Sequence, residues 1–251
     1  MHVTCSNAPC KDLSLTIRGG DGLVLYGGAC AIEVRAPGWL GVAPAGHVVW
    51  LPGDAGAVRI RSQGACRSAT LQRMAAPFAP EGPLVMDGRP LLHGLLHRLG
   101  QLPPEPGSPA TELISLALHE MHHARSVASF VTLPADPRLA SVCDRIEASL
   151  HRGHQAKACA RDSGLSARTL QRLFAQECGM ATATWIRRRR LLEALWRMGQ
   201  GESVAAVARG LGYRSFSAFG AMVRKAMGVG PRQFQVRAAV RATREAHANF
   251  V

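Results

Sequence analysis

The chain has 251 residues and a mass of 26.8 kDa, which accommodates one or two domains of about 150 residues each. Its residues are 47% hydrophobic, enough for a core, but no long uninterrupted apolar run marks a membrane span. The first residues lack the basic and then apolar pattern of a secretory signal. Seven cysteines without regular spacing argue against a disulfide framework. These features predict a reduced, cytoplasmic protein with no membrane partner.

The positive charge lies in the second half of the chain. Residues 1–137 carry 10 basic and 10 acidic residues, whereas residues 138–251 carry 20 basic and 7 acidic residues. Self-repulsion of this kind does not help a domain to fold, so it indicates a polyanionic partner. An anionic membrane surface is the alternative, but it favours one amphipathic helix with aromatic residues opposite its cations. Here the arginines are spread over several predicted helices, which favours nucleic acid.

The first predicted unit has the pattern of short β-strands. Apolar and polar residues alternate over residues 13–18, 30–35 and 58–61, and glycine or proline pairs separate these runs. Short strands at this spacing predict a small β-barrel or a sandwich.

The pattern becomes helical after Pro90. Leucines over residues 91–99 form one apolar stripe that ends at Gly100, and a proline-rich linker follows. A second helix is predicted from Thr111 to about Phe130, with Thr111 or Ser108 near its cap. Residues 133–137 then form a predicted rigid hinge.

The basic half is predicted to be helical throughout. Helix-start serines and helix-end glycines bound most of its elements. The expected helices are residues 139–150, 156–163, 167–178 after a Ser166 cap, 182–198, 204–210 after a Ser203 cap, a helix from a Ser215 cap to Gly228, and a last helix from Pro231 that carries Arg237, Arg241 and Arg244.

Two stretches of the basic half repeat each other. Residues 158–164 match residues 206–212 at an offset of 48, and after one inserted residue Ser166 aligns with Ser215. Each copy predicts a short helix, a glycine turn, a serine cap and a longer helix, which is the layout of a helix-turn-helix. Two copies in register within a strongly basic segment predict a paired DNA-binding domain.

This segment resembles the paired helix-turn-helix domain of the AraC/XylS family of bacterial transcription regulators. The resemblance covers about residues 138–236, with GLSARTLQRLF at 164–174, ECGM at 177–180, VARGLGYRS at 207–215 and GVGP at 228–231. Residues 20–60 resemble, less specifically, the cupin-like sensor domain that many such regulators carry.

The resemblance implies an α+β protein: an N-terminal cupin-like β-barrel followed by an all-α paired helix-turn-helix domain. The expected divisions are a sensor over 1–88, a helical connector and linker over 89–137, the DNA-binding domain over 138–236 and a basic tail over 237–251. Double-stranded DNA and RNA polymerase are the implied partners, together with an unknown small-molecule effector. No cofactor is expected.

The family pattern makes the helix after Ser166 the first recognition helix. Its predicted exposed side offers groups that contact guanine or adenine edges, or the DNA backbone. These candidate DNA-binding residues are Ser166, Arg168, Thr169, Gln171 and Arg172. The helix over 182–198 is the spacer, and its length of about 25 Å is of the right order to set the two recognition helices about 34 Å apart, one DNA turn.

The second motif departs from this chemistry. Its predicted exposed positions are mostly small or apolar: Arg214, Phe216, Ser217, Ala218, Gly220 and Ala221. Ser217 could read a base by a hydrogen bond and Ala218 by contact with a thymine methyl. We expect this half to bind mainly phosphates, through Arg214, Ser215, Arg224 and Lys225. In the Arg187–Arg190 run, one or two arginines are expected at phosphates and the others in solvent or paired with Glu193.

A zinc site is the main competing interpretation. His119, Glu120 and His123 match the H-E-x-x-H pattern, and Glu147 could be a third ligand. However, positions 112, 115, 119, 122 and 126 recur at steps of three and four, which is typical of the solvent face of an amphipathic helix. The histidines of cupin metal sites are not intact around His47, so no metal is expected there.

An enzyme with a DNA-targeting tail is therefore the alternative function. Its thiol- or zinc-dependent repair or hydrolase activity would use Cys5 and Cys10, or the histidine pattern above. Cysteines in strands are more often small core residues, and this applies to Cys5, Cys10, Cys30 and Cys66. Aromatic residues of the β unit suit either a ligand pocket or the core: Tyr26, Trp39 and Trp50.

Overall fold

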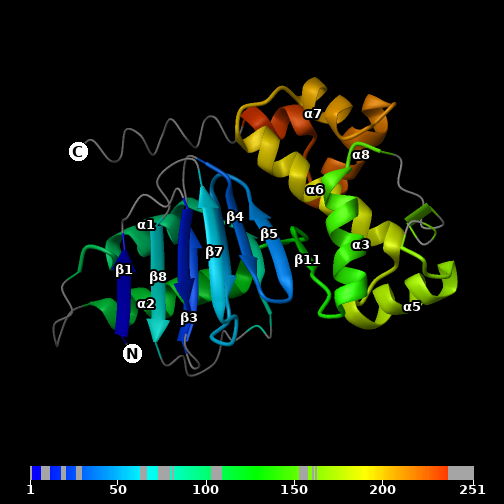
Figure 1. Cartoon of the computed structure of the whole chain (residues 1–251). Coiled ribbons are helices and arrows are strands. Elements are labelled where there is room, and N and C mark those ends of the chain that lie inside the picture. Colours follow the sequence, from blue (N-terminus) through cyan, green and yellow to red (C-terminus); the bar gives the residue numbers. More distant parts are fainter. Residues whose placement is uncertain are drawn as a thin grey trace.

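The computed structural model of the chain describes residues 2–6, 12–17, 21–26, 30–62, 67–72, 80, 82–102, 109–152, 158–159, 161 and 163–236. The strands gather in the N-terminal half, and the helices that follow α2 form a separate group beside them (Figure 1). This arrangement confirms the predicted α+β class, a β unit followed by an all-α unit.

The β unit consists of two antiparallel sheets among the described residues. The first sheet has the order β1 (His2–Ser6), β8 (Arg67–Gln72), β3 (Asp21–Tyr26), β6 (His47–Leu51), β9 (Leu84–Asp87) and β10 (Ser126–Val127). The second sheet has the order β11 (Phe130–Thr132), β5 (Trp39–Ala43), β4 (Ile32–Ala36), β7 (Ala57–Ser62) and β2 (Asp12–Thr16).

The two sheets bury their facing sides in one core. Leu25 and Val49 of the first sheet and Val34 and Ile60 of the second sheet are all almost fully buried in it. In β7, exposed and buried residues alternate along the whole strand. The period-two pattern of the sequence therefore reflects this shared core, as in sheets that pack face to face.

Two helices cover the other side of the first sheet. Helices α1 (Pro90–Leu99) and α2 (Ala110–His123) bury apolar residues against Val24 and Trp50, which point away from the shared core. The Tyr26 hydroxyl donates a hydrogen bond to the Leu96 carbonyl at 3.0 Å. Helix α1 ends before Gly100, as its leucine stripe predicts.

The second predicted helix is shorter than expected. Helix α2 ends at His123, and Ala124 turns into extended backbone with φ −71° and ψ 143°. The next residues then pair with sheet edges, β10 with β9 and β11 with β5. These non-local hydrogen bonds override the helical pattern up to Phe130. The N-cap residue of α2 is Pro109, so Thr111 lies near the cap, in the first turn, and no side chain caps the helix; Ser108 lies outside the described residues.

The basic half follows the predicted helices closely. Helices α3 (Pro137–Ala148), α5 (Ala167–Cys178), α6 (Thr182–Gly199), α7 (Val204–Gly210) and α8 (Phe216–Met227) are present, and residues 231–236 are helical. The predicted helix over 156–163 is described only in part, and the tail that carries Arg237, Arg241 and Arg244 lies outside the described residues. In the described segments, no helix has the length and apolarity needed to cross a bilayer.

The second sheet packs against α6. The Trp185 indole N–H donates to the Thr132 carbonyl at 2.8 Å, so the spacer helix is bonded to β11. The Arg61 guanidinium lies 5.2 Å from the ring centre of Trp196. The halves of the chain are thus joined through the spacer between the two predicted recognition helices.

Candidate nucleic-acid interface

The predicted first recognition helix corresponds to α5, which begins and ends where the sequence predicts. The Ser166 hydroxyl accepts a hydrogen bond from the Thr169 N–H at 3.0 Å, and Gly179 ends the helix in the left-handed region at φ 64°. Such a cap satisfies a helix N–H that would otherwise lack a partner. Leu170 and Phe174 are fully buried, which fixes the face that α5 presents to solvent.

The opposite face of α5 carries the candidate base-reading residues. Arg168, Gln171 and Arg172 are exposed on it. Thr169 is half-buried, and its hydroxyl lies 2.8 Å from the Ser166 Oγ as part of the cap. A guanidinium and an amide on one exposed helix face provide the bidentate groups that match guanine and adenine edges.

The second motif repeats this local architecture. Ser203 caps α7 at the Ala206 N–H, and Ser215 caps α8 at the Ala218 N–H, each at 3.3 Å. The turns before the two recognition helices contain Gly164 at φ 68° and Gly212 at φ 75°. A side chain at Gly212 would be strained by its φ and would collide with the His151 carbonyl oxygen. The two copies therefore share a backbone design.

The exposed surface of α8 differs from that of α5. Its apolar side packs inward through Phe219 and Val223. The exposed positions are Arg214, Ser215, Phe216, Ser217, Ala218, Ala221, Arg224 and Lys225. The Ser215 and Ser217 hydroxyls lie 2.6 Å apart and bond to each other. The expectation that Gly220 is exposed is wrong, because Gly220 is buried near Pro231.

Two of the four consecutive arginines in α6 have structural roles. Arg189 is buried, and its Nε donates to the Glu147 carboxylate of α3 at 2.9 Å. Arg190 donates to the Leu150 carbonyl at 2.9 Å and lies 6.0 Å from the ring centre of Tyr213. Arg189 therefore pairs with Glu147, a partner that was not among the expected environments of this run, which were phosphates, solvent and Glu193. Arg187 is exposed and Arg188 is half-buried.

Glu193 lies half-buried on the same helix, α6. Burial raises the pKa of its carboxyl above the ordinary value, and the neighbouring Arg189 and Arg197 oppose that rise. Arg197 itself is held by the Glu202 carboxylate, with Nε–Oε2 at 2.7 Å. Arg189 and Arg197 of α6 are thus paired with carboxylates of the basic half itself, Glu147 and Glu202, and do not form a free cationic surface.

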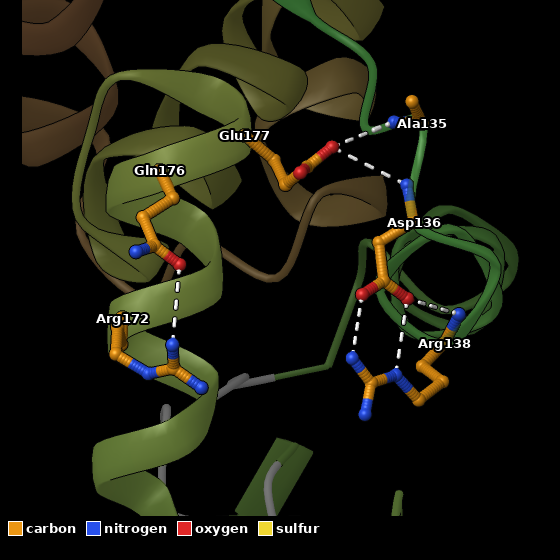
Figure 2. A network of polar contacts seen from close by, with 6 residues as sticks. All are labelled: Ala135, Asp136, Arg138, Arg172, Gln176 and Glu177. Carbon is orange, nitrogen blue, oxygen red and sulfur yellow. Dashed lines mark hydrogen bonds and ion pairs between the residues drawn. The ribbon is translucent and has the colours of Figure 1, made fainter.

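A polar network joins α5 to the hinge before α3 (Figure 2). The Glu177 carboxylate accepts hydrogen bonds from the backbone N–H groups of Ala135 and Asp136, at 3.0 and 3.3 Å. The Asp136 carboxylate caps α3 and bonds to Arg138, which holds its pKa down at about 2. Sequence reasoning recognised Glu177 only as part of the family motif, because its partners lie 41 and 42 residues away.

The zinc-like pattern lies on the solvent face of α2. His119 and His123 are exposed, with ring centres 4.3 Å apart. Glu147, the candidate third ligand, is bonded to Arg189 instead. Across the ranges that the structure describes, no three His, Cys, Asp or Glu side chains gather in a way that would hold a metal ion.

The remaining candidates of the β unit are core residues where they are described. The Cys30 Sγ is buried 2.9 Å from the Ser62 Oγ. Tyr26, Trp50 and His47 are buried, and Trp39 packs edge-on against Phe130. The side chain of Cys5 and the whole of Cys10 and Cys66 lie outside the described residues.

Two capped helix pairs joined by a spacer helix define a DNA-binding protein of the paired helix-turn-helix class. A family model described as "Helix-turn-helix domain" matches residues 159–237, which contain both motifs. The transcriptional regulator NimR of Escherichia coli (strain K12) is 36% identical over 73 residues, which is 29% of this chain and 27% of NimR. These matches agree with the AraC/XylS resemblance, and they show that residues 159–237 form a helix-turn-helix DNA-binding domain similar to that of a transcriptional regulator.

Solved structures of similar proteins include DNA-binding regulators. The DNA-binding domain of AdpA, solved with a target DNA, is 31% identical, covers 43% of this chain and 96% of its own, and has a TM-score of 0.39. ToxT from Vibrio cholerae is 9% identical, covers 94% of this chain and 97% of its own, and has a TM-score of 0.41. The chain spans about a quarter of the length of the curated relative NimR.

Proposed function

We propose that this chain is a one-component transcription regulator that binds a promoter or operator through two adjacent segments of the major groove. In this proposal α5 reads bases with Arg168, Gln171 and Arg172, and Ser166 and Thr169 support the helix start and contact the backbone. RNA polymerase is the partner expected on promoter DNA, and a small-molecule effector is expected to act on the β unit.

The contrast between the two recognition helices is the observation that carries the proposal. The exposed side of α5 offers two guanidinium groups and an amide, whereas that of α8 offers Phe216, Ala218 and Ala221. Hydrogen-bonding groups distinguish base pairs in the major groove, and cations bind phosphates without regard to sequence. The α8 motif therefore anchors the protein through Arg214, Arg224 and the Ser215–Ser217 pair, with Ala218 available to a thymine methyl.

Selection of bound sequences from randomised DNA tests this function. The full chain should enrich a two-part site whose parts are about one helical turn apart, with the stronger base preference in the part beneath α5. Its affinity should fall steeply as the salt concentration rises, because phosphate contacts release counterions. A folded chain that enriches no sequence and shows no salt-sensitive affinity for DNA would contradict the proposal.

A further inference from the structure

A cleft of about 470 Å³ lies between the second sheet and α3. The turn between β4 and β5, which contains Pro37 and Gly38, forms one wall, and residues 133–134 form another. Helix α3 lines the cleft with Ala140 and Asp144. This volume is in the range that accommodates a small organic molecule, about 300–1,000 Å³. The cleft is distinct from the recognition faces of α5 and α8.

The floor of the cleft carries a row of hydrogen-bond donors. Arg35, Arg59 and Ser14 are exposed neighbours on β4, β7 and β2, because Arg59 is opposite Arg35 in one pairing and opposite Ser14 in the other. Like charges directly opposite each other destabilise a sheet. Two residues along the same two strands, the next cross-strand pair on this face carries opposite charges: Glu33 and Arg61 form an ion pair at 2.9 Å. Sheet pairing alone therefore does not explain the two facing arginines.

The charge of the cleft selects the ligand. Two acidic residues of α3, Asp144 and Glu147, face the row of donors, but Glu147 is bonded to Arg189. Among the described lining residues, the two arginines and Asp144 then give the cleft a net charge of +1. A ligand with a single negative charge would neutralise it. The residues of the lining that are not core residues of the sheet add apolar surface: Pro37, Ala57, Leu133, Pro134 and Ala140.

We propose that this cleft binds a small organic acid. Its carboxylate accepts hydrogen bonds from Arg35 and Arg59, whose planar guanidinium groups match carboxylate geometry. Its apolar body packs against Pro37 and Leu133. Bound in this way, the acid neutralises the like-charge pair on the sheet and bridges the β unit to α3.

The position of the cleft links it to DNA recognition. The Leu133 N–H donates to the Gly38 carbonyl at 2.8 Å, so the β4–β5 turn and the hinge are bonded beside the cleft. Two residues later the hinge is held by Glu177 of α5 (Figure 2). A ligand seated against the hinge and the turn therefore changes the support of the first recognition helix. This consequence rests on the proposed function, whereas binding of the acid does not.

Calorimetry on the full chain without DNA tests the site, with 3-phenylpropionate as the probe and its neutral amide as the matched ligand. Saturable one-to-one binding of the acid is expected. The unaltered chain should bind the amide at least about tenfold more weakly than the acid, because charge-assisted hydrogen bonds are lost. The variant R35Q/R59Q should bind the acid more weakly by the same factor, for the same reason. The variant R98Q/R209Q removes two exposed arginines elsewhere and should bind like the unaltered chain.

Three outcomes would refute the proposed binding site. They are the absence of saturable binding, equal affinities for the acid and the amide, and a loss of acid affinity in R98Q/R209Q equal to that in R35Q/R59Q, which would show general charge attraction. The variant Ala140→Phe narrows the cleft without altering charge and should also abolish binding. Amide resonances of Gly38 and Leu133 should shift with the acid, and shifts confined to α5 and α8 would place the ligand elsewhere.

The coupling has a separate readout. Saturating acid should change the DNA affinity of the unaltered chain by about fivefold or more, and it should leave R35Q/R59Q unchanged. An unchanged affinity in a chain that binds the acid would overturn the coupling but not the site. Failure of the ligand-free chain to bind DNA would overturn the proposed function, and calorimetry would still decide the site.

Discussion

The ion pair between Arg189 and Glu147 is predicted to stabilise the fold without contributing to DNA affinity. The two side chains retain 7% and 19% of their exposure, and their charged groups meet at 2.9 Å. Removal of one partner from a buried pair costs about 3–5 kcal/mol because the other charge stays desolvated. Glu147 keeps some contact with water, so Arg189→Met should lower the free energy of unfolding by about 3 kcal/mol, near the lower limit of this range.

Urea unfolding of the full chain, followed by the fluorescence of the buried Trp185, measures this loss. The double variant Arg189→Met/Glu147→Leu should recover stability to within about 1 kcal/mol of the unaltered chain, because apolar pairs of similar size replace buried ion pairs at little cost. The salt dependence of DNA binding should stay unchanged in both variants.

Arg187 is the matched control, since it is exposed two residues earlier on the same helix. Arg187→Ala should leave the free energy of unfolding within about 0.5 kcal/mol and should lower the slope of log affinity against log salt by about 1, as expected for one phosphate contact. The reasoning would be refuted if Arg189→Met lowered this slope and left the urea midpoint in place.

Three further predictions concern the recognition helices and the hinge. Arg172→Ala should cost about 1–3 kcal/mol at the cognate site and relax the preference at one base pair, as measured on a panel of mutated operators. Arg224→Ala should weaken all sequences about equally and lower the salt slope by about 1; a strong preference beneath α8 that Ala218→Asp abolishes would contradict this anchoring role. Because the folded-state pKa of Asp136 is lowered from 3.8 to about 2, its contribution to stability should be present above pH 3.8 and fall as the pH drops toward 2. Asp136→Asn should flatten this part of a pH series of urea midpoints.

The helices of the DNA-binding part were predictable because their boundaries are set locally. Ser203 and Ser215 bond to N–H groups three residues ahead, and Gly179 and Gly228 end their helices with positive φ. Each of these choices is made within one turn of helix, so the residue types alone reveal it.

Features that depend on distant partners were not predictable in the same way. The prediction that the second helix continues beyond His123 is wrong, because residues 126–127 and 130–132 each add a strand to one of the two sheets. The sequence pattern does not show which sheet edge is available to such a strand. The partner of Arg189 was not predicted either: the four arginines were expected at phosphates, in solvent or paired with Glu193, whereas tertiary packing places Glu147 of α3 against Arg189.

The facing arginines of the cleft show the same limit. The sequence reveals that Arg35 and Arg59 point away from the core, because they alternate with buried Val34 and Val58. It does not reveal that β4 and β7 pair in the register that places the two arginines opposite each other. Side-chain direction is thus a local property of a strand, whereas a site built across strands depends on register.

The same distinction predicts where the DNA-binding part can be cut. Residues 131–251 should fold and bind DNA with the sequence preference of the full chain, because they retain the Thr132 carbonyl for Trp185 and the hinge N–H groups for Glu177. Residues 138–251 lose these partners and the Asp136 cap. They should be less stable by about 1–3 kcal/mol from the unpaired indole N–H alone, and the lost cap should lower the stability further.

Urea unfolding and salt-dependent DNA titration of both fragments test this prediction. Equal stabilities would show that the hinge contributes nothing, and a folded longer fragment without salt-sensitive DNA affinity would show that the helices α3 to α8 are not the DNA-binding unit.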